Sequence, residues 1–170
     1  MLCPHLHDPH LRVLAAACAL VLSGPAQAQD LIFSPAETEA CIAEAPGGEA
    51  SCIGGSAQAC MLDTPGGSST VVTGGCLERE RLYWDARLNA AYRARMAEAK
   101  AADADARAHG YRAPPQEDAL REMQRAWIAF RDARCTWAAS LWGGGTGGGP
   151  AAIGCAMQLT GEQALYLEHT

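Results

Sequence analysis

The sequence predicts an all-α fold, a small helical bundle held together by disulfides. We expect two long antiparallel helices, a C-terminal helix, and a short cysteine-rich helical segment before them. Three observations predict this class. Apolar residues recur at steps of three, four and seven through the second half of the chain. Glycine and proline runs separate these stretches. Six cysteines follow an export signal, and an even number of cysteines in an oxidising compartment predicts disulfides.

Residues 1–28 have the pattern of a signal peptide. A polar lead ends at Arg12, an apolar run of ten residues covers 13–22, and Ala26-Gln27-Ala28 supplies a small-residue cleavage site. The run is too short to cross a bilayer, which needs roughly 20 apolar residues. Cys18 lies in the run, but no clean lipobox precedes it. We therefore expect cleavage near Ala28 and a periplasmic or secreted protein with no membrane span in the mature chain.

The mature chain would keep six cysteines, and we expect all of them in disulfides. The sequence allows many pairings. Chain proximity favours neighbours, because each neighbouring pair closes a short loop that contains glycine, worth on the order of 3 kcal/mol. The favoured pairs are Cys41 with Cys52, Cys60 with Cys76, and Cys135 with Cys155. A zinc site would need C-x-x-C or Cys/His clusters, which this sequence lacks, so we expect no metal and no cofactor.

Residues 29–75 form a cysteine- and glycine-rich segment with few large apolar side chains. Ser34-Pro35 is typical of a helix start, and this helix should end near Pro46. A second short helix is expected over about 49–62, although Gly54 and Gly55 weaken it. Residues 64–69 form a turn. A segment this poor in apolar residues should be stapled by disulfides and packed on residues 76–170, the predicted helical domain.

The spacing turns helical from Cys76 to Ala108, where apolar residues at steps of four and seven share one face. His109-Gly110 ends this helix, and Pro114-Pro115 prevents its continuation. The apolar face comprises Leu77, Trp84, Leu88, Tyr92 and Met96.

A second long helix starts near Gln116, with acids in its first turn. Steps of three, four and seven predict an apolar seam against the first long helix. The glycine run 143–150 is expected to be a flexible loop, and the lack of a following lysine excludes a P-loop. A third helix carrying Cys155 near its start should fold back on the pair. The predicted seam of the second helix comprises Leu120, Met123, Trp127, Phe130, Trp137 and Leu141.

Charge argues against a nucleic-acid partner. The mature chain has 12 Lys and Arg against 18 Asp and Glu once Arg12 and Asp8 are removed, and phosphate binding needs a basic stripe. Paired carboxylates could serve glycoside hydrolysis, but acids beside arginines on helices are ordinary ion pairs. No nucleophile and base stand together, and we predict no enzyme activity. The polar candidates weighed for catalysis are Asp85, Asn89, Arg125, Arg131, Asp132 and Glu162.

The same polar residues suit a structural role better. Asp85, Asn89 and Tyr92 follow at steps of four and three on the first long helix. We expect them to hydrogen-bond across to the second long helix in a network that fixes helix register. Trp142, beside the glycine run, is expected to be exposed and to contact a partner. The residues expected from the second helix are Arg125, Arg131 and Asp132.

The chain resembles the lysozyme inhibitor LprI-like N-terminal domain family. The resemblance covers roughly residues 76–167 and lies in Trp84-Asp85-x-x-Leu88-Asn89-x-x-Tyr92, then Gln124-Arg125-Ala126-Trp127-Ile128-x-Phe130-Arg131-Asp132-Ala133-x-Cys135, a glycine-rich loop, Cys155 and Leu159-Thr160. It implies a small exported helical domain, in a family whose members are named for inhibition of lysozyme. The segment from Cys41 to Cys60 departs from a minimal member.

Two functions remain open at this point. The resemblance implies a protein-binding module that acts on a cell-wall glycosidase, with lysozyme or another basic cell-wall hydrolase as its partner. Net negative charge would steer such a partner, and the loops 65–75 and 143–150 are the candidate contacts. The alternative is a structural or assembly module of the cell envelope without lysozyme inhibition.

Overall fold

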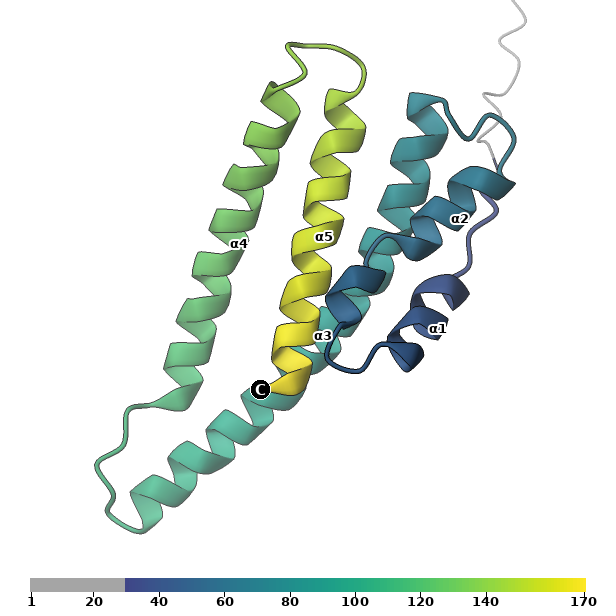
Figure 1. Ribbon diagram of the computed structural model, residues 1–170. Coiled ribbons are helices and arrows are strands. Elements are labelled where there is room, and N and C mark those ends of the chain that lie inside the picture. The colour runs from purple at the N-terminus through teal and green to yellow at the C-terminus, as the bar shows by residue number, and fades with distance from the viewer. Residues whose placement is uncertain (1–29) are drawn as a thin grey trace, which may run out of the picture.

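The computed structural model describes residues 30–170, and the predicted signal peptide lies outside this range. Within it the chain is helical and contains no strand, which confirms the predicted all-α class (Figure 1). Two short helices and one 3-10 helix precede three long helices. The elements are α1 (Ala36–Glu44), η1 (Glu49–Cys52), α2 (Gly55–Asp63), α3 (Thr70–Ala108), α4 (Gln116–Ser140) and α5 (Gly148–His169).

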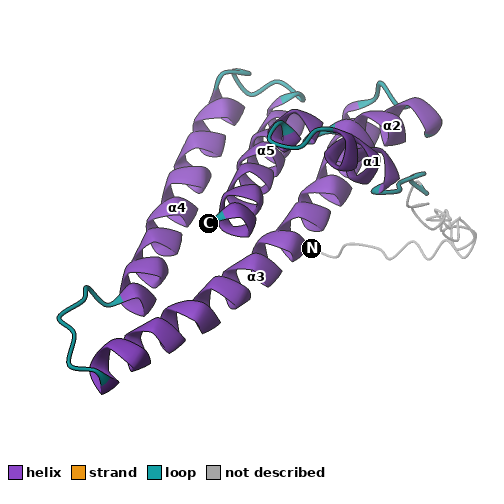
Figure 2. Ribbon diagram, turned by 60° about the horizontal axis from the view of Figure 1, so that its bottom comes forward, coloured by secondary structure: helices purple, strands orange, loops and turns teal. Residues whose placement is uncertain are grey.

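The three long helices set the shape of the molecule. α3 and α4 run antiparallel and are joined by residues 109–115, while α5 lies between them over most of its length, as Figures 1 and 2 show. The bonds between α3 and α4 gather near their shared loop, where the Asp103 carboxylate accepts the N–H groups of Gln116 and Glu117 at 2.8 and 3.0 Å. α5 therefore packs against both helices, whereas the sequence predicts that α3 and α4 pack directly against each other.

The core lies mainly between α3 and α5. Trp84 and Leu88 of α3 are buried against Met157 and Leu167 of α5, as the period of α3 predicts. Gly161 of α5 lets this packing close, because a Cβ there would lie 2.7 Å from the Ile53 side chain and 3.1 Å from the Trp84 indole.

Three disulfides join successive elements. Cys41–Cys52 links α1 to η1, Cys60–Cys76 links α2 to α3, and Cys135–Cys155 links α4 to α5. Each bond pairs cysteines that are neighbours along the chain, as chain proximity favours. The bundle is thus stapled at each step from the N-terminal segment to the last helix.

A buried carboxylate fastens the N-terminal segment to α3. Glu80 is fully buried and accepts the N–H groups of Gly54 and Ala57 at 2.7 and 2.6 Å, the Thr38 hydroxyl at 2.9 Å and the Trp84 indole N–H at 3.1 Å. Gly54 and Ala57 lie at the N-terminus of α2, where unpaired N–H groups and the helix dipole favour an anion. Glu80 therefore joins α1, α2 and α3 through one side chain.

Several helix boundaries differ from those expected. The helix expected over 49–62 is divided at Gly54, whose φ of +102° ends η1 and starts α2. α3 begins at Thr70 instead of Cys76, because the Ser69 hydroxyl accepts the N–H of Val72 and caps the helix. α5 begins at Gly148, which places Pro150 in the first turn, where its missing N–H costs nothing. Residues 148–150 are therefore helical and not part of the loop.

Only the first half of the predicted α4 seam is packed. Leu120, Met123 and Trp127 contact the core, whereas Phe130, Trp137 and Leu141 are 55%, 62% and 66% exposed. The disulfide explains the difference. Cys135 must face α5 to reach Cys155, and at 3.6 residues per turn this turns those three side chains about 120–160° away from it. The prediction that these three residues form a buried seam is wrong.

Candidate protein-binding surface

The six residues of the predicted polar network are not brought together. On α3, the Asn89 amide donates to the Asp85 carbonyl and carboxylate at 2.8 and 3.0 Å. On α4, the Arg131 guanidinium donates to its neighbour Asp132 at 2.8 and 2.9 Å. Each side chain finds its partner on its own helix, so the predicted bonds between α3 and α4 do not form. The remaining two members lie apart, Tyr92 packed at the edge of the core and Arg125 exposed.

Other side chains make the bonds between helices. Arg87 of α3 donates twice to Glu168 of α5, at 2.6 and 3.0 Å, in a bidentate ion pair. Gln163 of α5 donates to Gln124 of α4 at 3.1 Å. These contacts carried no sequence signal that set them apart from other surface pairs.

Five of the six residues weighed for catalysis have a partner on their own helix, and the sixth, Arg125, is exposed. The Glu162 carboxylate accepts the Gln158 amide at 2.9 Å on α5, while Asp85 and Arg131 are held on α3 and α4 as described above. Within residues 30–170, no three His, Cys, Asp or Glu side chains are grouped so that they could hold a metal ion. In the same range, no helix is long and apolar enough to cross a membrane.

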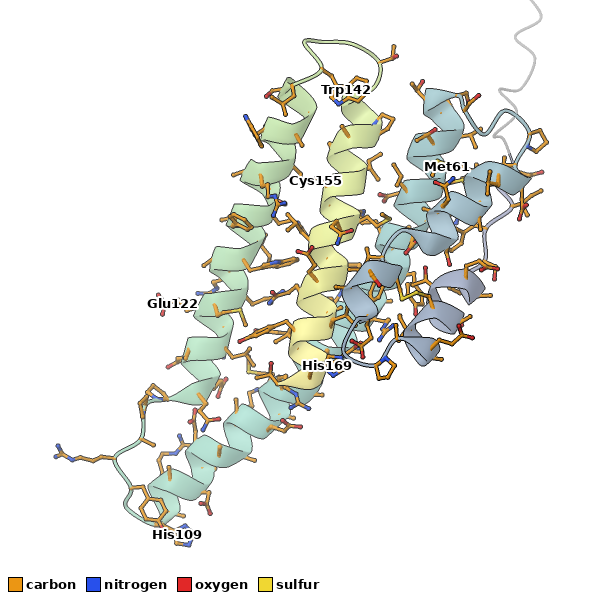
Figure 3. All side chains as sticks on the ribbon, in the orientation of Figure 1. Met61, His109, Glu122, Trp142, Cys155 and His169 are labelled. Atoms are coloured by element: carbon orange, nitrogen blue, oxygen red, sulfur yellow. A yellow bond between two sulfur atoms is a disulfide. The ribbon has the colours of Figure 1, made fainter. Side chains whose placement is uncertain are left out.

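The two loops expected to contact a partner meet at one end of the bundle. Trp142 lies there, where α4 passes into α5, far from His109 at the other end of α3 (Figure 3). Its indole is 55% exposed and borders a pocket of about 290 Å³. We call this the Trp142 pocket. Its other lining residues come from the start of α3, the α4–α5 connection and the first turn of α5: Thr70, Thr73, Thr146, Gly147, Pro150 and Ala151.

The indole of Trp142 is held in place by the backbone of the glycine loop. A Cβ on Gly147 would lie 2.2 Å from two carbons of the ring, so only a glycine allows the ring to approach this closely. One part of the indole therefore packs on the loop while the rest faces the pocket. Because the side chain is already positioned, little side-chain entropy remains to be lost when a partner covers it.

The residues that line the Trp142 pocket carry no formal charge. Residues 64–77 and 135–161 contain no Asp, Glu, Lys or Arg. The negative charge is concentrated elsewhere, since residues 30–78 hold seven acids and no Lys or Arg, while residues 79–170 hold 12 basic and 11 acidic residues. Four of those acids lie on α1 and η1, and Glu49 of η1 lies 3.9 Å from His169, at the end of α5 opposite Trp142 (Figure 3). The apolar Trp142 pocket and most of the acidic residues of α1 and η1 therefore lie on different parts of the molecule.

A second apolar feature runs along the outer face of α4. Phe130, Arg134, Trp137 and Leu141 follow at steps of four, three and four, so they share one face of the helix. We call these four residues the α4 stripe. The Arg134 guanidinium lies 6.0 Å from the centre of the Phe130 ring. Among the described residues, no carboxylate lies within ion-pair distance of Arg134.

Comparison with known proteins places this surface inside a recognised family domain. The family described as "Lysozyme inhibitor LprI" matches residues 60–167, from α2 to near the end of α5. An "Uncharacterized 17.7 kDa protein in puhA 5'region" from Rhodobacter capsulatus is 32% identical over 161 residues, which is 93% of this chain and 96% of that protein. No solved structure matches. The matched range includes both the Trp142 pocket and the α4 stripe.

Proposed function

This chain belongs to the family of lysozyme inhibitor LprI, and from that premise we propose that it is an exported protein-binding module that inhibits a cell-wall glycosidase of the lysozyme class. The proposed contact surface is the end of the bundle that carries the Trp142 pocket. The proposed partner is lysozyme or another basic cell-wall hydrolase.

One observation carries the choice of surface. Trp142 is half-exposed, is positioned by Gly147 and stands on an uncharged end of the bundle, within the segment that matches the family. The centre of a protein interface is depleted of charged residues, and tryptophan is enriched among the residues that contribute most to binding. These properties fit an anchor residue with a small apolar surround.

The disulfides and the charge distribution support the cellular setting. Three disulfides suit an oxidising compartment, such as the periplasm or the exterior, where cell-wall glycosidases act. Cleavage near Ala28 would leave residues 29–170 there as the mature protein. The acidic segment 30–78 would attract a basic enzyme at long range and raise its association rate, and the uncharged end would then make the contact.

A lytic assay tests the proposal. Disulfide-intact protein covering residues 29–170 is added to lysozymes of several classes, and the clearing of a bacterial cell-wall suspension is followed. We expect inhibition of at least one class, weakened about 30-fold by Trp142→Ala because a strong anchor contributes about 2 kcal/mol or more. Tyr166→Ala is the matched control, since Tyr166 is also 55% exposed but lies near the opposite end of α5. It should leave inhibition unchanged.

The same assay can reject the proposal. Full lysis with every lysozyme class at micromolar protein would contradict it and would favour an envelope assembly module. Inhibition that falls equally in both variants would reject the Trp142 pocket as the contact surface.

A further inference from the structure

We infer that the α4 stripe enters the substrate cleft of the inhibited glycosidase, with the guanidinium of Arg134 facing the two carboxylates of its active site. This inference rests on the function proposed above and deepens it. It assigns the occupant of the cleft to a helix face and not to the glycine loop, and it names one charged residue as the contact to the catalytic groups.

The α4 stripe is a rigid apolar surface that no other element covers. Phe130, Trp137 and Leu141 are 55%, 62% and 66% exposed, although a single soluble domain normally exposes such side chains singly. The Cys135–Cys155 disulfide fixes the rotation of α4, so that these side chains point outward together. From Phe130 to Leu141 the stripe extends for about 16 Å along the helix. It presents a straight, convex edge, and such an edge fits a groove.

The charge on the stripe is complementary to a glycosidase cleft. Glycoside hydrolases place two carboxyl groups on either side of the scissile bond. Arg134 has no carboxylate partner of its own within residues 30–170, whereas the charge of Arg131 is already paired with Asp132. A guanidinium binds a carboxylate through two parallel hydrogen bonds and, being weakly hydrated, is the cation best suited to an interface. The free charge on the stripe therefore matches the charge that the cleft offers.

The position of Arg134 within the stripe matches the expected order of contacts. It lies between Phe130 and Trp137, one turn from the first and three residues from the second. Sugar-binding clefts are lined by apolar faces that stack on sugar rings, with the carboxylates between them. On the stripe, Phe130 and Trp137 flank the Arg134 guanidinium, so apolar and charged groups alternate as they do along such a cleft. Leu141 is followed directly by Trp142, so the stripe continues into the Trp142 pocket, which would contact the rim of the cleft.

The surroundings of the stripe are compatible with this partner. The charged residues of 123–161 are three arginines and one aspartate, whereas those of 30–78 are all acidic. The acidic element α1 lies on the opposite side of the molecule from α4 (Figure 1), and η1 packs at the C-terminal end of α5, where Glu49 lies 3.9 Å from His169. Their acids would therefore not repel the carboxylates of the cleft. An overall basic enzyme with an acidic cleft would thus be attracted by the whole protein and contacted by its cationic face.

Three variants and one matched control test the inference. Arg134→Glu and Trp137→Ala change the stripe. Arg125→Glu makes the same charge change at an exposed position about 180° away around α4, where Arg125 forms no ion pair with any residue of 30–170. We expect the inhibition constant to rise at least 30-fold for Arg134→Glu and about tenfold for Trp137→Ala, and to change less than twofold for Arg125→Glu. Arg134→Gln, which retains an uncharged side chain of similar length, repeats the test without charge reversal. Circular dichroism and the melting temperature verify that each variant is folded.

Competition gives a second readout that a purely structural role would not change. Inhibition should be competitive with an N-acetylglucosamine oligosaccharide. Replacing the catalytic acid of the enzyme by its amide should weaken binding of the wild-type inhibitor more than binding of Arg134→Gln. Unchanged inhibition by Arg134→Glu and Trp137→Ala, or non-competitive inhibition, would overturn the inference while leaving the proposed function intact. Lack of inhibition by the wild-type protein would overturn both.

Discussion

Replacing Glu80 by glutamine should release the N-terminal segment from the helical bundle. The carboxylate of Glu80 is fully buried, and its Oε1 accepts from Thr38, Gly54 and Trp84 while its Oε2 accepts from the Ala57 N–H at 2.6 Å. A glutamine can keep one oxygen in place but must turn an NH₂ group toward at least one of these donors. The substitution therefore removes both a charge-assisted bond and the negative charge that faces the N-terminus of α2.

The size of the effect follows from these contacts. Losing one charge-assisted hydrogen bond and leaving its buried N–H unpaired should lower the free energy of unfolding by about 2–4 kcal/mol. For a domain of this size that corresponds to a melting temperature roughly 10 °C lower. Glu78→Gln is the matched control, because Glu78 lies two residues away on α3 and makes a partly exposed ion pair with Arg81. It should cost less than about 1 kcal/mol.

The assay is equilibrium urea unfolding at pH 7 with all disulfides intact, followed by circular dichroism and by tryptophan fluorescence, to which the buried Trp84 contributes. We expect the midpoint to fall clearly for Glu80→Gln and to stay near wild type for Glu78→Gln. If the free energies of unfolding of the two variants agreed within about 0.5 kcal/mol, buried Glu80 would contribute no more to stability than partly exposed Glu78, which contradicts the role assigned to Glu80.

Three further predictions concern other parts of the molecule. Gly147→Val should displace the Trp142 ring, because even a Cβ would lie 2.2 Å from it; near-ultraviolet circular dichroism should change, and it should not if the ring is free. Replacing Cys135 and Cys155 together by serine should lower the free energy of unfolding by about 3 kcal/mol in urea titrations, and an unchanged midpoint would contradict the stapling role. The N–H groups of Glu117 and Gln116 donate to the Asp103 carboxylate and hold its pKa below the ordinary value of an aspartate. Its contribution to the free energy of unfolding is therefore present above the ordinary pKa and is lost as the pH falls through the lower pKa of the folded state. Asp103→Asn should reduce the melting temperature at pH 7 but not at the acid end of a pH series.

The sequence was sufficient to predict the fold class and the main core helix. The four- and seven-residue steps of α3 placed Trp84 and Leu88 in the core, where both are buried. Glycine and proline runs located the connections between the long helices. These features are local, and local patterns are what periodicity and helix-ending residues report.

The predicted orientation of the α4 side chains is wrong because apolar spacing was considered without the disulfide. Apolar spacing alone predicts that Phe130 and Trp137 are buried, but Trp137 follows Cys135 by two residues and must point about 160° away from it. Once Cys135 is paired with Cys155, the outward position of Trp137 follows from helix geometry. Considering the disulfide and the helix period together would have identified the α4 stripe.

Other features depended on contacts between distant parts of the chain. The donors that surround Glu80 include Thr38, which lies 42 residues away, and no local pattern marks such a partner. The predicted polar network between α3 and α4 does not form, because local partners are available instead. Asn89 and Arg131 bond to residues four positions and one position away on their own helices. Short-range partners are available to a polar side chain on a helix before any neighbouring helix is reached.

Inhibition of cell-wall lysis shows directly whether this protein inhibits a lysozyme. Mature wild-type protein, its Trp142→Ala variant and its Tyr166→Ala control should be titrated against lysozymes of several classes in one clearing assay. We expect inhibition of at least one class by the wild type and the control, and an inhibition constant about 30-fold higher for Trp142→Ala. Undiminished lysis with every class at micromolar wild-type protein would contradict this expectation.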